Sequence, residues 1–494
     1  MTKESAKSIQ TIGKNSKTTA SPSNLLIRSF SRMKAGLGII VVIFMVAHLY
    51  YNNPMTMDSD LELIANSNFS KTVTNAPTPK EYQKESPIKA TIAYATSITK
   101  CSESSVIMDQ AAILMYSIHK SSVRVPQSGS KYDYDLYVFL HPDAAECKEK
   151  LERIGWTVLM KESPIEVEDI RGELKNHVRT ASCCGEKEFL KLYSYTLTNY
   201  PVVVHFDLDV IMLQPLDELY DSMIDGPSSP SRSRVTAMWQ SEPEFPNEIE
   251  AFFTRDYNMV NPGSRKPHQI GVQGGFIIVK PNPNYFEEYV QIILEGNYTV
   301  GNGWGDKLAY GGFYGAAQIQ GLCSYFFGHV RPGTALELNR CVYNSMVDNP
   351  FADEPGYGGL CRTTQPVDQC EDCRLTNYSL IKTAHFTVCQ KPWWCVGYKA
   401  HTEEHKSVWL ELHYLCMKMH HAWYKTRKEL EFAWSSQDTE YRHITENVTK
   451  TLALLYPEMI KTTTLGFCAG GGEKDYFRME FPKKTINLKG NARL

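Results

Sequence analysis

The segment from Pro201 to Leu213, PVVVHFDLDVIML, restricts the possible fold of this chain more than any other. Its first half is a nearly continuous apolar run rich in valine, which is typical of a strand buried on both faces of a sheet. Two carboxylates, Asp207 and Asp209, follow immediately. We therefore expect them at the carboxyl end of a strand in an open α/β sheet, the edge at which such sheets hold ligands.

Strand-like and helix-like patterns alternate on both sides of this segment, which predicts βαβ crossovers and a mostly parallel sheet with helices on both faces. A longer amphipathic pattern at 409–434 predicts a helix that packs against this core. The expected strands are 90–96, 134–140, 156–160 and 201–206, and the expected helices before the segment are 106–121, 143–154 and 186–199.

Composition supports a globular chain and excludes some functions. The 494 residues are 42% hydrophobic and 22% charged, values of a chain that buries a core. The 52 basic and 55 acidic residues are largely interspersed, whereas a protein that binds nucleic acid needs a clustered basic excess. The one basic cluster lies in residues 1–34, so we expect no nucleic-acid partner.

Residues 35–51 form an uncharged apolar run at the short end of what spans a bilayer. Basic residues precede the run and acidic residues follow it, which predicts a cytosolic N-terminus and a single-pass type II membrane protein. A cleaved signal peptide is the alternative, but no A-x-A-like cleavage site follows the run. The rest of the chain is then lumenal, in the Golgi membrane or the endoplasmic reticulum.

The cysteines and glycosylation sequons are consistent with that topology. All thirteen cysteines lie beyond residue 100, and the N-x-[ST] sites at Asn68, Asn297, Asn377 and Asn447 all follow the apolar run. The spacing Cys370-x-x-Cys373 suits either zinc or disulfides. An oxidising lumen favours disulfides, whose pairing the sequence leaves open.

Two short segments carry groups suited to a metal and a diphosphate. Asp207 and Asp209 are spaced to share a divalent ion, and oxygen ligands favour Mg²⁺ or Mn²⁺. The alternative is a solvated turn after the strand. In HFTVCQKPW, His385 is a further candidate ligand and Lys391 a candidate phosphate-binding cation, although a lone histidine is often a core residue.

Taken together, these segments resemble glycosyltransferase family 8, the glycogenin-like nucleotide-sugar transferases. Four blocks occur in the family's order: TIAYATS at 91–97, the block at 189–221, GVQGGFIIVKP at 271–281, and HFTVCQKPW at 385–393. The resemblance covers roughly residues 89–400. It implies a Rossmann-like nucleotide-sugar transferase fold and metal-dependent, retaining transfer of a hexosyl unit from a nucleotide sugar, with UDP as the expected nucleotide, to a glycan, protein or lipid acceptor.

The resemblance also implies the roles of individual residues. Asp207, Asp209 and His385 align with ligands of Mn²⁺ or Mg²⁺. The residues implied to bind the donor are Tyr94, Thr96, Ser97, Lys191, Asp207, Leu208, Asp209, Gln273, Gly275 and Lys391. Those implied to act at the reacting sugar are Lys191, Gln273 and Gln320.

Three departures from the family pattern bear on activity. Gln273-Gly274-Gly275 stands where the family usually has Asn-Ser-Gly, Ile319 stands where it usually has an acid, and Val388 replaces a glycine. Both front-face attack and a covalent intermediate remain possible, and Ile319 favours front-face attack. These departures also leave open a relative that binds nucleotide sugar or glycan without turnover. His401 and His405 fit a short zinc-peptidase pattern, a weaker third hypothesis.

The expected organisation has six parts. They are a cytosolic basic tail (1–34), a transmembrane anchor (35–51), a stem (52–88), a catalytic domain (89–400), a helical extension (401–460) and a C-terminal tail with little fixed structure (461–494).

Overall fold

The computed structural model describes most of the chain beyond residue 87. The described ranges are 88–102, 105–181, 184–237, 245–310, 313–396, 414–444 and 462–490. The chain divides into two units at residues 80 and 81, and all described residues belong to the second. The predicted basic tail and anchor, nearly all of the stem, and His401 and His405 therefore lie outside the described residues. Within the described ranges, every helix is too short or too polar to cross a membrane.

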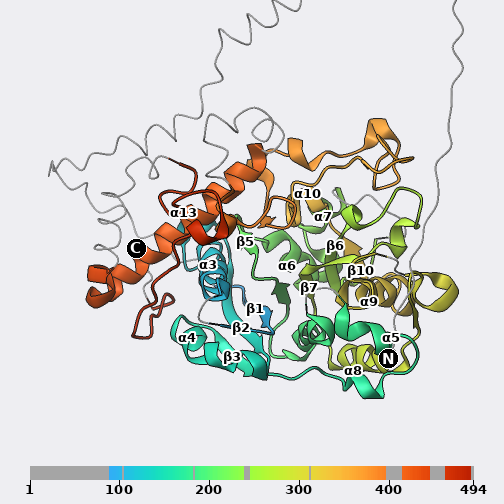
Figure 1. Ribbon diagram of the computed structural model, residues 1–494, viewed down its shortest axis with the longest axis horizontal. Coiled ribbons are helices and arrows are strands. Elements are labelled where there is room, and N and C mark those ends of the chain that lie inside the picture. Colours follow the sequence, from blue (N-terminus) through green and yellow to red (C-terminus); the bar gives the residue numbers. More distant parts are fainter. Residues whose placement is uncertain are drawn as a thin grey trace, which may run out of the picture. The chain divides into compact units, whose positions relative to one another are not determined.

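A mixed α/β architecture surrounds one large sheet (Figure 1). Its strand order is β10-β6-β7-β4-β1-β2-β3, and β7 runs antiparallel to both of its neighbours while the other pairs are parallel. The strands of this sheet are β1 (Ala90–Ile98), β2 (Tyr132–Leu140), β3 (Thr157–Met160), β4 (Val203–Phe206), β6 (Ala251–Arg255), β7 (Val272–Val279) and β10 (Ala335–Glu337). The expectation of a mostly parallel sheet is confirmed.

Two small sheets complete the strands. β5 (Val210–Met212) pairs antiparallel with β11 (Thr383–His385), and β8 (Tyr298–Thr299) pairs with β9 (Gly303–Trp304). The described α-helices are α3 (Ile107–Lys120), α4 (Lys148–Arg153), α5 (Leu174–His177), α6 (Asp217–Ile224), α7 (Arg232–Ala237), α8 (Pro283–Glu295), α9 (Ile319–Tyr325), α10 (Arg340–Tyr343) and α13 (Tyr414–Gln437).

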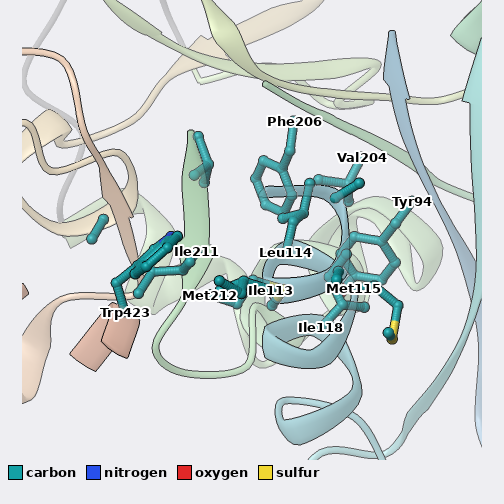
Figure 2. Close-up of a cluster of buried hydrophobic side chains, with 14 of the residues drawn as sticks. Tyr94, Ile113, Leu114, Met115, Ile118, Val204, Phe206, Ile211, Met212 and Trp423 are labelled. Carbon is teal, nitrogen blue, oxygen red and sulfur yellow. The ribbon is translucent and has the colours of Figure 1, made fainter. Parts of the chain in front are cut away.

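Successive side chains of β1 and β4 point to opposite faces of the sheet, and each face has its own hydrophobic core. Val204 and Phe206 point to the face covered by α3 and belong to one hydrophobic cluster with Ile113, Leu114 and Met115 (Figure 2). The neighbouring Val203 points to the opposite face, which is packed with side chains of α8 and α9. Helices thus cover both faces, and the apolar run of β4 is fully buried, as its composition predicts.

The expected helix at 186–199 is wrong in type. Gly185–Thr196 forms a long 3₁₀ helix, η5. Residues i and i+3 lie above one another in a 3₁₀ helix, and this geometry places Glu188 beside Lys191. The local apolar spacing suited either helix type, so only tertiary packing decides between them.

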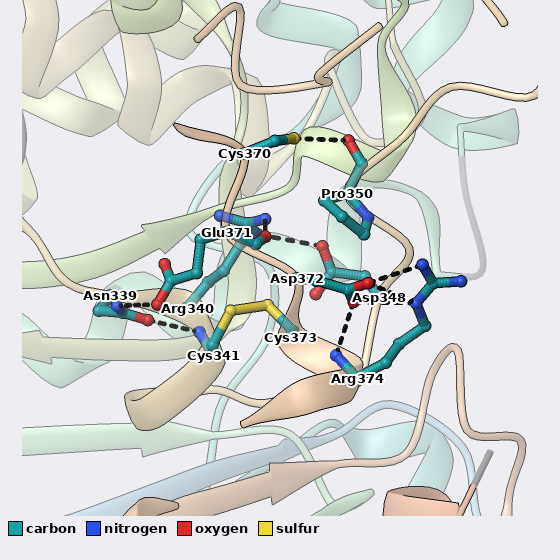
Figure 3. Close-up of a disulfide and its surroundings, with 10 residues drawn as sticks. All are labelled: Asn339, Arg340, Cys341, Asp348, Pro350, Cys370, Glu371, Asp372, Cys373 and Arg374. Carbon is teal, nitrogen blue, oxygen red and sulfur yellow. Dashed lines mark hydrogen bonds and ion pairs between the residues drawn. A yellow bond between two sulfur atoms is a disulfide. The ribbon is translucent and has the colours of Figure 1, made fainter. Parts of the chain in front are cut away.

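The clustered cysteines form disulfides, and Cys370 and Cys373 are not arranged as zinc ligands. Cys373 pairs with Cys341 beside the Arg340–Asp348 and Arg374–Asp372 ion pairs (Figure 3), so Cys370 and Cys373 do not share a ligand. The bonds found are Cys101–Cys147, Cys341–Cys373, Cys361–Cys370, Cys389–Cys416 and Cys395–Cys468. Among the described cysteines, Cys323 is buried and forms no disulfide.

The expectation of little fixed structure near the C-terminus is wrong for residues 462–490. Tyr476 donates a hydrogen bond from its hydroxyl to Asp109 Oδ2 over 2.8 Å, and its ring lies against Trp423 of α13. Cys468 is tied covalently to Cys395. Glycine-rich composition suggested a loose end, but long-range partners that sequence does not reveal hold the segment in place.

Candidate functional site

The turn after β4 brings the two predicted aspartates to the carboxyl edge of the sheet. Asp207 N–H donates to Gly275 O over 3.0 Å, which continues the β4–β7 pairing past the last strand residue. β5 then pairs with β11 so that Val210 lies opposite His385. One ligand atom each from Asp207, Asp209 and His385 lies within 4.8 Å of the others. The structure therefore brings together the three residues predicted as metal ligands.

The surroundings of this trio fit a divalent cation. A Cβ on Gly275 would stand 2.7 Å from both Asp207 Oδ2 and His385 Cε1, so only a glycine leaves room there. His385 Nδ1 lies 3.1 Å from Asn344 Oδ1, and Asn344 Nδ2 donates to Thr254 Oγ1 over 2.9 Å. If Nδ1 carries the proton, Nε2 is left as a ligand atom, 3.4 Å from Asp209 Oδ1. Two carboxylates and an imidazole form a donor set that suits Mn²⁺ or Mg²⁺.

Two lysines face these carboxylates from different directions. Lys391 forms an ion pair with Asp209 Oδ2, and its side chain is 23% exposed. Lys191 is only 6% exposed and pairs with Asp207 Oδ1 at 2.8 Å and with Glu188. Lys391 can therefore reach a ligand in solvent contact, whereas Lys191 is enclosed by protein.

The electrostatics keep Asp209 ionised. Burial alone would raise the pKa of the Asp209 carboxyl, but the nearby His385 and Lys391 bring it well below its usual range. Burial likewise opposes the charge of Lys191, yet Asp207 and Glu188 raise the pKa of its ammonium above the usual value. Asp209 is thus held in its carboxylate form, the form in which it can ligate a metal ion.

The residues expected at the reacting sugar lie near one another. Gln273 Oε1 accepts from Gly275 N over 2.6 Å, and the side chain of Gln320 lies beside Gly274. Ile319 is 1% exposed and belongs to the core beneath β7, so it offers no polar group to the site. Gln320 is the residue of α9 that faces the site.

A buried acid missed by the sequence analysis lies beside Gln320. Gln320 Nε2 donates to Asp256 Oδ2 over 3.4 Å, while Asp256 Oδ1 is buried without a partner among the described residues. Burial and the charge of Asp348 raise the pKa of Asp256 to about 6, and His385 acts in the opposite direction. Asp256 directly follows β6, so its only sequence signal was an acid after a short apolar strand.

The residues expected to bind the nucleotide are only partly assembled. The Tyr94 hydroxyl lies 2.6 Å from that of Tyr220 in the core, 5% exposed, and Thr96 is fully buried. Ser97 is half-buried on the opposite face of β1, 3.4 Å from His205 Nε2. Leu208 is half-buried between the two aspartates. The structure therefore leaves Ser97 and Leu208 partly accessible and encloses Tyr94 and Thr96.

Comparison with known proteins gives matches among solved structures alone. No protein-family model matches the chain, and no curated protein does. Mouse xyloside xylosyltransferase 1 in its apo form is 12% identical with a TM-score of 0.35, covering 60% of this chain and 97% of that one. An active-site mutant of LgtC is 11% identical with a TM-score of 0.33, covering 65% and 94%. The glycosyltransferase GlyE of Streptococcus pneumoniae is 10% identical with a TM-score of 0.32, covering 62% and 57%. All three of these similar structures are of glycosyltransferases.

Proposed function

We propose that this chain is a metal-dependent glycosyltransferase of family 8 that moves a hexosyl unit from a nucleotide sugar to a glycan, protein or lipid acceptor. The observation that carries the proposal is the convergence of Asp207, Asp209 and His385 beside Lys391 at the carboxyl edge of the sheet. Asp209 and Lys391 are 182 positions apart in the sequence, yet their side chains form an ion pair at the candidate metal site. The Lys391 side chain is partly exposed there. Such a site is suited to a diphosphate.

Each group has a role in this proposal. Asp207, Asp209 and His385 would hold Mn²⁺ or Mg²⁺, which when bound supplies positive charge to stabilise a departing diphosphate. Lys391 exchanges its ion pair with Asp209 for a phosphate oxygen of the donor. Gln273 and Gln320 orient the sugar, and Asp256 accepts a hydrogen bond from a sugar hydroxyl through its free oxygen.

The mechanism we favour is front-face attack with retention of configuration. Ile319 places no carboxyl at its position, and Asp256 is paired with Gln320. The departing phosphate then takes the acceptor proton itself. The donor nucleotide we propose is UDP, and the location is the Golgi membrane or endoplasmic reticulum, with residues 35–51 as a single type II anchor.

The test is donor hydrolysis by the full chain purified in detergent. UDP- and GDP-sugars are supplied with Mn²⁺, with Mg²⁺ or with chelator, and nucleotide release is followed. We expect release of one nucleotide that needs the metal and is lost in Asp209→Asn. Conversely, Mn²⁺-dependent UDP binding without turnover of any donor, with or without a panel of acceptors, would favour a non-catalytic binding protein. Unchanged turnover in Asp209→Asn would exclude this site altogether.

A further inference from the structure

Lys191 has no hydrogen-bond donor left for a ligand. Its ammonium carries three N–H groups. Three protein acceptors surround it: Glu188, Asp207 Oδ1 at 2.8 Å and Gly274 O at 3.0 Å. With its side chain only 6% exposed, this lysine is a fixed internal charge beside the candidate metal site.

The Lys191 charge acts against metal binding by Asp207, and Glu188 counteracts this effect. A cation 2.8 Å from a carboxylate offsets part of its charge and so lowers the attraction of that carboxylate for a metal ion. Glu188 shares the ammonium with Asp207, so the Glu188–Lys191 pair is neutral as a unit. Asp207 then retains its negative charge, with Oδ2 on the side of His385.

The 3₁₀ conformation of η5 favours this sharing. Glu188 and Lys191 are three residues apart, the spacing at which side chains stack along such a helix. The Lys191 ammonium reaches from η5 to the carbonyl of Gly274 in β7 and to Asp207 after β4. One side chain thus links three elements at the edge of the site.

We propose that Glu188 is a positioning residue of the metal site, which through Lys191 balances the charge next to Asp207 and so sets the affinity for the divalent cation. The inference rests on the proposed function, because it assumes that Asp207 ligates that cation. It concerns the affinity of the metal site before any donor binds.

The experiment measures Mn²⁺ binding to the full chain without nucleotide, with free Mn²⁺ counted by electron paramagnetic resonance. We expect Glu188→Gln to weaken Mn²⁺ binding about tenfold, because the Lys191 charge is then balanced by Asp207 alone. The double variant Glu188→Gln/Lys191→Met removes both charges of the pair, so we expect its affinity to return to within about threefold of the parent.

Two further variants separate this effect from misfolding. Glu188→Asp keeps the charge and should bind Mn²⁺ within about threefold of the parent. Glu186→Gln removes an acid from the same helix outside the site and should leave the affinity unchanged. Circular dichroism and melting temperature report the folding of each variant.

The outcomes distinguish this inference from the proposed function. If the parent binds Mn²⁺ and folded Glu188→Gln binds it equally well, the role of Glu188 is overturned while the metal site stands. A double variant as weak as Glu188→Gln overturns the charge balance in the same way. If the parent itself fails to bind Mn²⁺, the proposed metal site fails first.

Discussion

The pKa values of two carboxyl groups in the site, Asp209 and Asp256, are shifted in opposite directions. Asp209 is held ionised by His385 and Lys391, while Asp256 is buried next to another acid and resists ionisation. The difference follows from their neighbours, since both come shortly after buried strands. One acid is therefore suited to a metal, and the other to hydrogen bonding with a hydroxyl-rich ligand.

The raised pKa of Asp256 predicts a pH-dependent stability. The folded carboxyl binds its proton up to about pH 6, and the unfolded one releases it near 4. Between those values the folded state binds more protons, so the free energy of unfolding falls as pH rises from about 4 to 6. Asp256→Asn should remove this fall, leave the chain more stable at pH 7, and reduce donor turnover.

Urea unfolding of the metal-free chain across this pH range checks the prediction. Asp306→Asn, at an exposed acid, is the control and should keep the fall seen in the parent. If Asp256→Asn instead lowers the free energy of unfolding at pH 7, the ionised Asp256 carboxylate is not destabilising in the folded protein and the prediction is wrong.

The close packing around Gly275 predicts that a side chain there would disturb the candidate metal site. Gly275→Ala would place a methyl group 2.7 Å from Asp207 Oδ2 and His385 Cε1, so one of them must move. We expect Mn²⁺ binding to weaken at least about tenfold, because a ligand position is lost. Gly358→Ala, where a Cβ meets nothing within 4 Å, is the matched control. Titration calorimetry with Mn²⁺ measures both, and equal affinities would contradict the site geometry.

Sequence reasoning predicted the groups that stand out locally and missed those defined by contacts. Asp207 and Asp209 follow a buried strand and are visible from the sequence alone, as is His385 once its block is identified. Asp256 and Glu188 become functional candidates only because β6 and η5 place them next to Gln320 and Lys191. Tyr94 is in the expected strand, but its side chain points to the α3 face of the sheet.

At the scale of elements, α13 supports the loop that carries Lys391. His420 Nε2 lies 2.8 Å from Cys389 O, and the Tyr424 hydroxyl donates to Pro392 O over 2.6 Å. Between these two residues of α13, Trp423 is buried against Trp393 of the same loop. The helix therefore holds the backbone on both sides of the lysine.

Trp423→Ala tests this support. Truncating a buried tryptophan leaves a cavity, and we expect the free energy of unfolding to fall by about 3–5 kcal/mol. Phe432 lies on the same helix but is 72% exposed, so Phe432→Ala should change it by no more than about 0.5 kcal/mol. Denaturant unfolding measures both variants. Similar losses would mean that α13 does not pack as described.

The pattern of elements was easier to predict than their direction or type. The strands β1 to β4 and helix α3 lie where apolar spacing placed them, because each buries a regular face. The antiparallel direction of β7 depends on how the chain returns to the sheet, which composition does not encode. The 3₁₀ form of η5 likewise depends on packing against β1, β4 and α8.

At the scale of the whole molecule, the C-terminal segment is part of the folded unit that carries the candidate site. Arg427 of α13 lies over the rings of Phe467 and Tyr476, and Tyr476 in turn bonds to Asp109 of α3. Asp109 and Tyr476, which are 367 positions apart, thus share one buried cluster. Tertiary contacts of this range explain why a glycine- and lysine-rich end of the chain is part of the fold.

Two disulfides connect this cluster to the site. Cys389–Cys416 and Cys395–Cys468 flank Lys391 in the sequence and attach its loop to α13 and to the C-terminal segment. Because the loop is cross-linked at both ends, Lys391 stays near Asp209 at little entropic cost on binding. Formation of these two disulfides therefore supports the proposed diphosphate site as well as the stability of the fold.

Removing the Cys395–Cys468 disulfide should lower both the stability of the fold and the affinity for a diphosphate ligand. Cys395→Ala/Cys468→Ala opens a loop of 73 residues, and loop entropy predicts a loss of about 4 kcal/mol in the free energy of unfolding. We also expect weaker Mn²⁺-dependent UDP binding, since the Lys391 loop is freed at one end. Cys361→Ala/Cys370→Ala is the matched control, because that bridge closes a loop of nine residues that does not contain Lys391. Its removal should lower the free energy of unfolding by about 2.5 kcal/mol and leave UDP binding unchanged.

Calorimetric titration with UDP on folded variants distinguishes the two bridges. Equal UDP affinity in both variants would show that Cys395–Cys468 stabilises the fold without positioning Lys391.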